Sequence, residues 1–405
     1  MNVEEENKSL EYNKQLVLKQ LWFYLLRFWG EPLEESILLE LLDTINDNKV
    51  VTEPKKSSSY FGWGSKSTSG DTKGKTDMSF DPFTKYGIDK DASESLFWNS
   101  LNIETPDDYV LKFLRARKWH FEKSISMLVK ALEWRLSKFD TLKIIRGGER
   151  KFYNDNKQGV VKNLELQKAV ICGYDLKGRP IIIVRPHLHY SKDQTPEELE
   201  EYALLVIEQT RLFFKEPVLS ATILFDLTDF TMANMDYAPV KFLVEVFEAH
   251  YPECLGHLMI HNAPWLFSPI WNVIKAWLDP IVASKIMFTY NTKDLLTWIS
   301  KENLPEYLGG ELGFDFDSYV CPDESADETL TDVEQRDPIQ KEREAIIRSL
   351  KDKTIEWIKT KDETKSQELF NERIEIMEKL SKNYASLDLY VRSRSTYDIN
   401  GSLKL

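Results

Sequence analysis

Residues 251–288 contain a strongly apolar helical segment between two strand-like segments, and this arrangement limits the possible folds more than any other part of the chain. Asn272 and Lys275 interrupt the helix, whose apolar side chains are Trp265, Leu266, Phe267, Ile270, Trp271, Val273, Ile274, Trp277 and Leu278. A helix that is apolar on nearly all sides is either fully buried or contacts apolar material outside its own core. Its length of roughly ten residues is too short for a bilayer, which requires about 20. We interpret it as the movable wall of a lipid-holding pocket.

The overall charge and the cysteines limit the class of protein. The 405-residue chain has a net charge of −13, which argues against a nucleic-acid partner because such partners require a basic surface. The three cysteines form no CxxC motif, as expected for reduced thiols in a cytosolic protein. No secretion signal or spanning helix is predicted, since Met1–Asn7 is acidic and the apolar run Leu16–Trp29 is short and contains charges. We therefore expect a cytoplasmic protein that is peripheral on endomembranes, such as the endosome, the endoplasmic reticulum or lipid droplets.

The N-terminal part divides at a change of composition. Residues 1–45 predict a helical extension, for which two interpretations are open: an amphipathic helix for a membrane or a partner, and a helix packed on the main body. Residues 46–84 are rich in Ser, Gly, Thr and Lys and predict a flexible linker. Within this linker, Gly62–Ser67 lacks the glycine spacing of nucleotide-binding loops, so no phosphate site is expected there.

The middle of the chain predicts a helical module followed by an α/β layer. Residues 85–148 form the module, in which Thr105–Asp108 carry the signals of a helix start. Within residues 149–320, a β-hairpin is predicted at 169–184, and Ala221–Leu227 is apolar enough for a buried central strand. Strands that alternate with helices indicate an α/β fold with one sheet.

The C-terminal part, residues 321–405, predicts an acidic linker and a helical extension. Helices are expected at about 338–360, capped by Asp337-Pro338, and at about 363–392. No heptad repeat is long enough for a coiled coil. We interpret the two helices as a hairpin that lies on the main body.

The order of several short motifs resembles the CRAL-TRIO lipid-binding domains, and is most similar to their fungal phosphatidylinositol-transfer branch. The motifs cover roughly residues 90–320 and are specific in combination, although each alone is a weak signal. They are Phe113–Trp119, Lys177–Pro180, Phe225–Leu227, Tyr251–Glu253, Asn262–Trp265, Leu278–Pro280, Ser284–Ile286 and Glu302–Gly310. The resemblance implies an α/β CRAL-TRIO fold, in which a helical N-terminal module docks on a mixed β-sheet floor. Further helices would form a lipid pocket, with Phe267–Leu278 as its gate helix.

The resemblance also implies which residues bind a phosphatidylinositol headgroup: Arg117, Glu253, Val282 and Lys285, with Ile286 beside them. Lys285 or Arg117 can supply the cation that a buried phosphodiester needs, and Glu253 can accept hydrogen bonds from inositol hydroxyls. Val282 stands where the family has Thr, which removes one hydroxyl contact. The alternative is a buried ion-pair network that holds the module to the lipid domain. The predicted pocket and gate residues are Trp265, Phe267, Ile270, Trp271, Ile274, Trp277 and Leu278.

A second ligand is implied by comparison with family members that exchange phosphatidylcholine. These members hold the choline headgroup with Tyr residues before the KGRP turn and with a Ser/Thr pair that leads into the central strand. The corresponding positions here are Val170, Ile171, Ala221 and Ile223, which are all apolar. A choline phosphate buried there would keep unpaired oxygens, which is costly. We therefore expect the second ligand to be an apolar lipid, such as a sterol or an isoprenoid hydrocarbon.

No catalytic arrangement is found in the sequence, so we expect neither an enzyme nor a metal site, and no cofactor other than bound lipid. GxSxG and HExxH motifs do not occur, and His187 and His189 have no third metal ligand near them. We expect a monomer that touches membranes transiently through the aromatic gate residues and transfers or presents phosphatidylinositol. The alternative is a lipid-regulated scaffold that acts on a partner such as a small GTPase or a lipid kinase.

Overall fold

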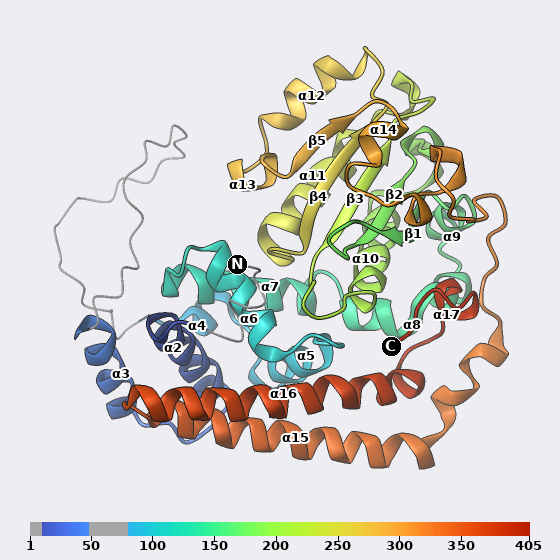
Figure 1. Cartoon of the computed structure of the whole chain (residues 1–405). Coiled ribbons are helices and arrows are strands. Elements are labelled where there is room, and N and C mark those ends of the chain that lie inside the picture. The colour runs from blue at the N-terminus through green and yellow to red at the C-terminus, as the bar shows by residue number, and fades with distance from the viewer. Residues whose placement is uncertain (1–9, 48–79) are drawn as a thin grey trace.

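The computed structural model describes residues 10–47 and 80–405 of the protein, which form a helical part and a sheet-based part (Figure 1). Most of the predicted linker 46–84, including Gly62–Ser67, lies outside the described residues. Helix α4 (Pro82–Tyr86) nevertheless begins inside the predicted linker range, because the Asp81 side chain caps it by accepting a hydrogen bond from the backbone N–H of Phe83.

The sheet-based part contains one five-stranded mixed sheet with the order β1-β2-β3-β4-β5. β1 and β2 form the predicted antiparallel hairpin, with Ala169 opposite Val184, and the other neighbouring strands are parallel. Parallel strands need crossover connections, which helices α10, α11 and α12 provide. The predicted α/β fold with a mixed sheet is thus confirmed. The elements are β1 (Ala169–Tyr174), β2 (Pro180–Val184), α10 (Pro196–Leu212), β3 (Ala221–Asp226), α11 (Tyr237–Glu245), β4 (Leu255–His261), α12 (Phe267–Lys275) and β5 (Ile286–Thr289).

Both faces of the sheet are covered by apolar side chains, because successive strand residues point to opposite faces. On one face, Ile182, Ile223 and Leu258 line a cavity. On the other face, Ile181, Ile183, Leu224 and Met259 pack against Leu295, Ile299, Leu304 and Leu308. This double coverage explains why β3 reads as a continuous apolar run.

The helical part joins the predicted module to both terminal extensions. One buried core contains Leu21 of α2, Leu114 of α6, Leu350 of α15 and Leu369 of α16. In Figure 1, α15 and α16 run side by side along the base of the helical part. The structure therefore agrees with the packed-helix and hairpin interpretations of the two termini. The elements are α2 (Tyr12–Phe28), α3 (Glu35–Asp47), α5 (Lys90–Ser100), α6 (Pro106–Ala116), α7 (Phe121–Ser137), α8 (Thr141–Asn154), α9 (Gln158–Glu165), α15 (Val333–Lys359) and α16 (Glu363–Val391).

Helix α15 starts earlier than predicted, since Asp332 caps it through the backbone N–H of Gln335 and Pro338 lies inside the helix. Among residues 10–47 and 80–405, no helix has both the length and the hydropathy needed to cross a membrane. The remaining short elements are η1 (Pro186–Leu188), η2 (Ser191–Asp193), η3 (Met232–Asn234), η4 (Val246–His250), α13 (Pro280–Ala283), α14 (Thr292–Leu295), η5 (Lys301–Asn303), η6 (Glu306–Leu308), η7 (Glu324–Thr331) and α17 (Thr396–Ile399).

Candidate functional site

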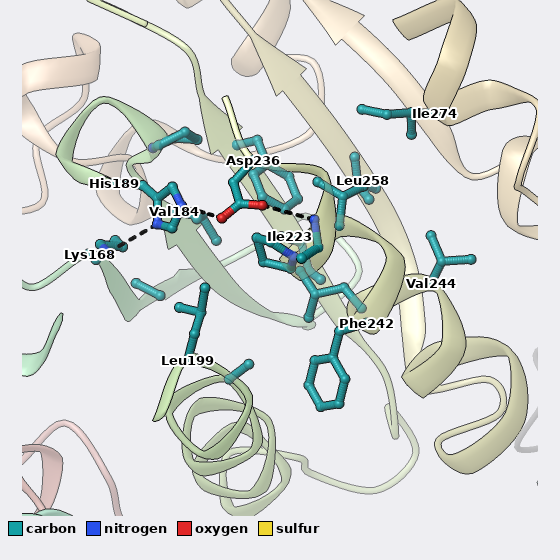
Figure 2. Close-up of a pocket in the computed structure, with 18 of the residues that line it drawn as sticks. Lys168, Val184, His189, Leu199, Ile223, Asp236, Phe242, Val244, Leu258 and Ile274 are labelled. Atoms are coloured by element: carbon teal, nitrogen blue, oxygen red, sulfur yellow. Dashed lines mark hydrogen bonds and ion pairs between the residues drawn. The ribbon is translucent and has the colours of Figure 1, made fainter. Parts of the chain in front are cut away.

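A cavity of about 370 Å³ lies between the sheet and helices α10, α11 and α12. This volume is within the range of ligand pockets, and most of the lining is hydrocarbon. Figure 2 shows Val184, Ile223 and Leu258 of the sheet facing Leu199 of α10 and Phe242 of α11 across this space. The arrangement suits the burial of an acyl chain or another hydrocarbon body, which is favourable by about 0.8 kcal/mol per methylene group.

The predicted gate residues fall into three groups. Four of them line the cavity, namely Phe267, Trp271, Ile274 and Leu278. Ile270 is buried in the cluster behind them. The other two are Trp265 and Trp277, which contribute to the outside of the segment and to its contact with α11.

The segment that contains α12 is held against α11 by an aromatic contact. The ring of Trp277 meets the ring of Tyr237 edge-on, with centroids 5.6 Å apart, and the Nζ atom of Lys241 lies 4.9 Å from the Trp277 ring. Such contacts contribute roughly 0.5–1.5 kcal/mol each. Trp265 is 87% exposed, and Ile281 is 51% exposed. Residues 265–281, called the gate segment after their predicted role, therefore have an apolar inner side and exposed apolar groups on their outer side.

Glu253 forms an ion pair with Arg115, whose Nε atom lies 2.5 Å from Oε2 of Glu253. Arg117, the arginine predicted for the headgroup site, donates through Nη1 to the carbonyl oxygen of Ala116. Glu253 has a φ of 59°, which is uncommon for a residue with a side chain. Such strained residues concentrate at functional sites. The backbone conformation is therefore consistent with Glu253 as part of a binding site.

Lys285 lies near Glu253 and is partly buried. Its Nζ atom donates to the carbonyl oxygen of Leu255 at 2.6 Å. Burial lowers the pKa of Lys285, and the neighbouring carboxylate of Glu253 opposes that shift. Val282 and Ile286, on either side of Lys285 in the chain, line the cavity. The structure therefore brings Glu253 and Lys285 together next to the cavity wall, with Arg115 as their third charged neighbour.

The four positions predicted for the second ligand lie in four different places. Ile223 lines the main cavity, and Ala221 lines a small void next to Ile223. Val170 points to the opposite face of the sheet, where it packs with the core behind the cavity. Ile171 lies on the edge strand β1, where Tyr397 of α17 covers it and accepts a hydrogen bond from its backbone N–H. The structure thus corrects the expected placement of Val170 and Ile171.

Ile182 was missed by sequence reasoning. It is the register partner of Ile171 on β2, one strand closer to the centre of the sheet, and it lines the cavity. Its period-2 alternation with Val184 could have indicated that the two residues share one face.

A polar cluster in the cavity wall was also missed. The Nζ atom of Lys168 lies 3.4 Å from Nδ1 of His189, and Nε2 of His189 lies 3.4 Å from Oδ2 of Asp236 (Figure 2). Burial lowers the pKa of His189, and the ammonium of Lys168 lowers it further. No local pattern could have revealed this cluster, because its members come from three separate loops and strand ends.

The helical module is joined to α10 by a buried network of charges. Glu104 accepts hydrogen bonds from Lys112 at 2.5 Å and from Arg211 at 2.9 Å. Glu208 accepts from Arg211 at 2.8 Å and from Arg135 at 2.9 Å. The alternative to a headgroup site was an ion-pair network of Arg117, Glu253 and Lys285 between the module and the lipid domain. One such contact is present with a different arginine, because Glu253 pairs with Arg115 of the module.

Among residues 10–47 and 80–405, no group of three or more His, Cys, Asp or Glu side chains is arranged so that it could hold a metal ion.

Comparison with known proteins identifies the family. Residues 164–310 match the CRAL/TRIO domain, and residues 65–130 match the CRAL/TRIO N-terminal domain. The chain is 43% identical to the phosphatidylinositol transfer protein CSR1 of Eremothecium gossypii over 98% of both chains. It is 38% identical to the CRAL-TRIO domain-containing protein C3H8.02 of Schizosaccharomyces pombe, over 75% of this chain and 67% of that protein. It is 29% identical to the Sec14 cytosolic factor of the same organism, over 50% of this chain and 74% of that protein. The chain therefore belongs to the CRAL/TRIO family.

Proposed function

We propose that this protein is a non-catalytic lipid-binding protein that transfers phosphatidylinositol between membranes or presents it at their surface. The observation that carries the proposal is the apolar cavity closed by a gate segment, with a cation beside its wall. The near full-length similarity to a phosphatidylinositol transfer protein supports the same function. We infer that the protein works as a monomer in the cytoplasm and contacts endomembranes only transiently.

Lys285 and Glu253 are the proposed headgroup residues. A phosphodiester removed from water needs a cation, and the Lys285 ammonium is already partly desolvated. Inositol hydroxyls are donors that the Glu253 carboxylate can accept, in exchange for part of its contact with Arg115. Arg117 is retained as a candidate that would have to turn toward the ligand.

The second ligand is proposed to be an apolar lipid rather than phosphatidylcholine. Ile182 and Ile223 form the floor of the cavity, and neither can donate a hydrogen bond to a phosphate oxygen. A sterol or an isoprenoid hydrocarbon would bury its surface there without leaving oxygens unpaired.

The K285M substitution should reduce the transfer of labelled phosphatidylinositol between vesicles roughly 30-fold, because loss of one partner of a buried charge pair costs about 2 kcal/mol or more. E253Q should weaken transfer less, since the amide can still accept from a hydroxyl. The matched control is K293M, which removes an exposed lysine at the start of α14. Transfer by K285M at the rate of the K293M control would contradict the headgroup assignment.

The W271D substitution tests the gate. Trp271 lines the cavity, and its ring centroid lies 5.3 Å from that of Phe288. An open gate would bring its indole to the membrane interface. We expect transfer to fall at least roughly tenfold, because a carboxylate is strongly disfavoured in both environments. N272D adds the same charge at the neighbouring exposed position and should retain most of the transfer. A folded W271D variant with unchanged transfer would show that this segment is not a gate.

A further inference from the structure

The cavity has one polar end. Figure 2 shows Lys168, His189 and Asp236 across the cavity from Ile274 of the gate helix. Lys168 and His189 are only 5% and 7% exposed, so both are removed from bulk water. Two buried polar side chains in a hydrocarbon-lined space need hydrogen-bond partners. The hydrogen bonds that they already make show which donors are left for a ligand.

The hydrogen bonds within the cluster fix its proton arrangement. A carboxylate only accepts, so Nε2 of His189 carries the proton that is shared with Asp236. Nδ1 of His189 is then an acceptor for the Lys168 ammonium, and Oε1 of Gln194 accepts a second Lys168 hydrogen bond at 3.3 Å. An ammonium has three donors, so one donor of Lys168 stays available.

The charge of Lys168 is uncompensated at close range. Within the described part of the chain, no carboxylate oxygen lies within 4.0 Å of its Nζ atom. Asp193, whose carboxylate acts on Lys168 electrostatically, is itself paired with Lys162 at 2.9 Å. Burial lowers the pKa of Lys168 to about 8, and the carboxylate of Asp193 opposes that shift only in part. Lys168 therefore lacks one acceptor oxygen and a negative charge in direct contact with its ammonium.

We propose that Lys168 binds the carboxylate of a lipid acid whose hydrocarbon body fills the apolar part of the cavity. This inference rests on the proposed function, because it names a ligand class for the same cavity. A hydroxyl would supply the missing acceptor but not the missing charge. A phosphate monoester would bring more charge and more acceptor oxygens than the cluster can satisfy. The hydroxyl of Ser191, which lines the same end, can donate to the second carboxylate oxygen.

The experiment compares a fluorescent polyene fatty acid with its methyl ester, both titrated into the delipidated full-length protein. The two probes share one hydrocarbon chain and differ in the charge of the head group and in one methyl group. We expect the acid to bind roughly tenfold to 100-fold more tightly than the ester. K168M should remove that preference and leave ester binding unchanged. K192M, an exposed lysine in the same loop as Ser191, should keep the preference.

Three results would overturn the inference: equal affinity of the wild-type protein for acid and ester, equal weakening of both probes by K168M, and the same effect from K192M as from K168M. The thermal unfolding of K168M is measured in parallel, and an unfolding temperature close to that of the wild-type protein shows that the variant is folded. A wild-type protein that transfers phosphatidylinositol but shows no preference for the acid would overturn this inference alone. A protein that transfers no phosphatidylinositol and binds neither probe would overturn the proposed function as well.

Discussion

The A203W substitution should lower the affinity of the protein for its hydrocarbon ligands about 100-fold. Ala203 lies on α10 and lines the cavity, so an indole at this position would occupy space that the ligand needs. Exclusion of roughly four methylene groups from the cavity removes about 3 kcal/mol of burial free energy. The measurement is lipid binding by the purified variant, together with its transfer of phosphatidylinositol between vesicles.

The matched control for A203W is A345W, which adds the same side chain to an exposed position of α15. The A203W variant should unfold at a temperature no lower than the wild-type protein, because the new side chain fills empty volume. If A203W folds and binds lipid like the A345W control, the cavity is not the lipid site.

The R373M substitution should lower the free energy of unfolding by about 3–5 kcal/mol, since it leaves a buried carboxylate without its cation. Arg373 of α16 is fully buried and donates two hydrogen bonds to Asp107 of α6, at 2.7 Å and 2.9 Å. Trp22 of α2 donates a third hydrogen bond to the same carboxylate through Nε1, at 2.7 Å. One charge pair thus joins the N-terminal helix, the module and the C-terminal hairpin.

Urea denaturation measures the effect of R373M, with R348M as the control. Arg348 is exposed on the other helix of the hairpin, and its removal should change the free energy of unfolding by no more than about 0.5 kcal/mol. Equal stabilities of R373M and R348M would mean that the hairpin does not depend on the Asp107 contact. The Arg373–Asp107 ion pair also matters for the candidate headgroup site, because α6 carries Arg115, the ion-pair partner of Glu253.

The sheet and the gate segment could be predicted because their signals are local. An apolar run such as Ala221–Leu227 identifies a strand that is covered on both faces. The short helix Phe267–Lys275 is apolar on most sides. This pattern indicates a helix that lies between a cavity and a second apolar environment outside the protein core. In both cases the pattern within a few residues determines the environment of the element.

The individual contacts that pack the termini could not be predicted, because they join distant segments of the chain. Helix α2 buries Gln15, Lys19 and Gln20 along with its apolar residues, so its periodicity does not show which side faces the core. Lys19 is satisfied by the carbonyl oxygen of Thr360, which is 341 residues away in the chain. Only the folded arrangement shows that these polar side chains have partners.

The sequence predicted that the candidate site contains an arginine, a lysine and a glutamate, but it did not predict which arginine contacts the glutamate. Arg115 lies in the last turn of α6, whereas Arg117 follows the end of that helix, so the choice of partner for Glu253 depends on where α6 ends and how it is oriented. The sequence places both arginines in one motif and cannot distinguish them. The contact between Lys168 and His189 could not be predicted, because the two residues meet only after the chain has folded around the cavity.

The identity of the lipid that the protein carries when purified from eukaryotic cells tests the central claim most directly. Extraction and mass spectrometry should find phosphatidylinositol and a mainly apolar lipid, together close to one molecule per protein, with phosphatidylcholine absent or at trace level. Stoichiometric phosphatidylcholine, or a protein that carries no lipid and accepts none from vesicles, would contradict the account.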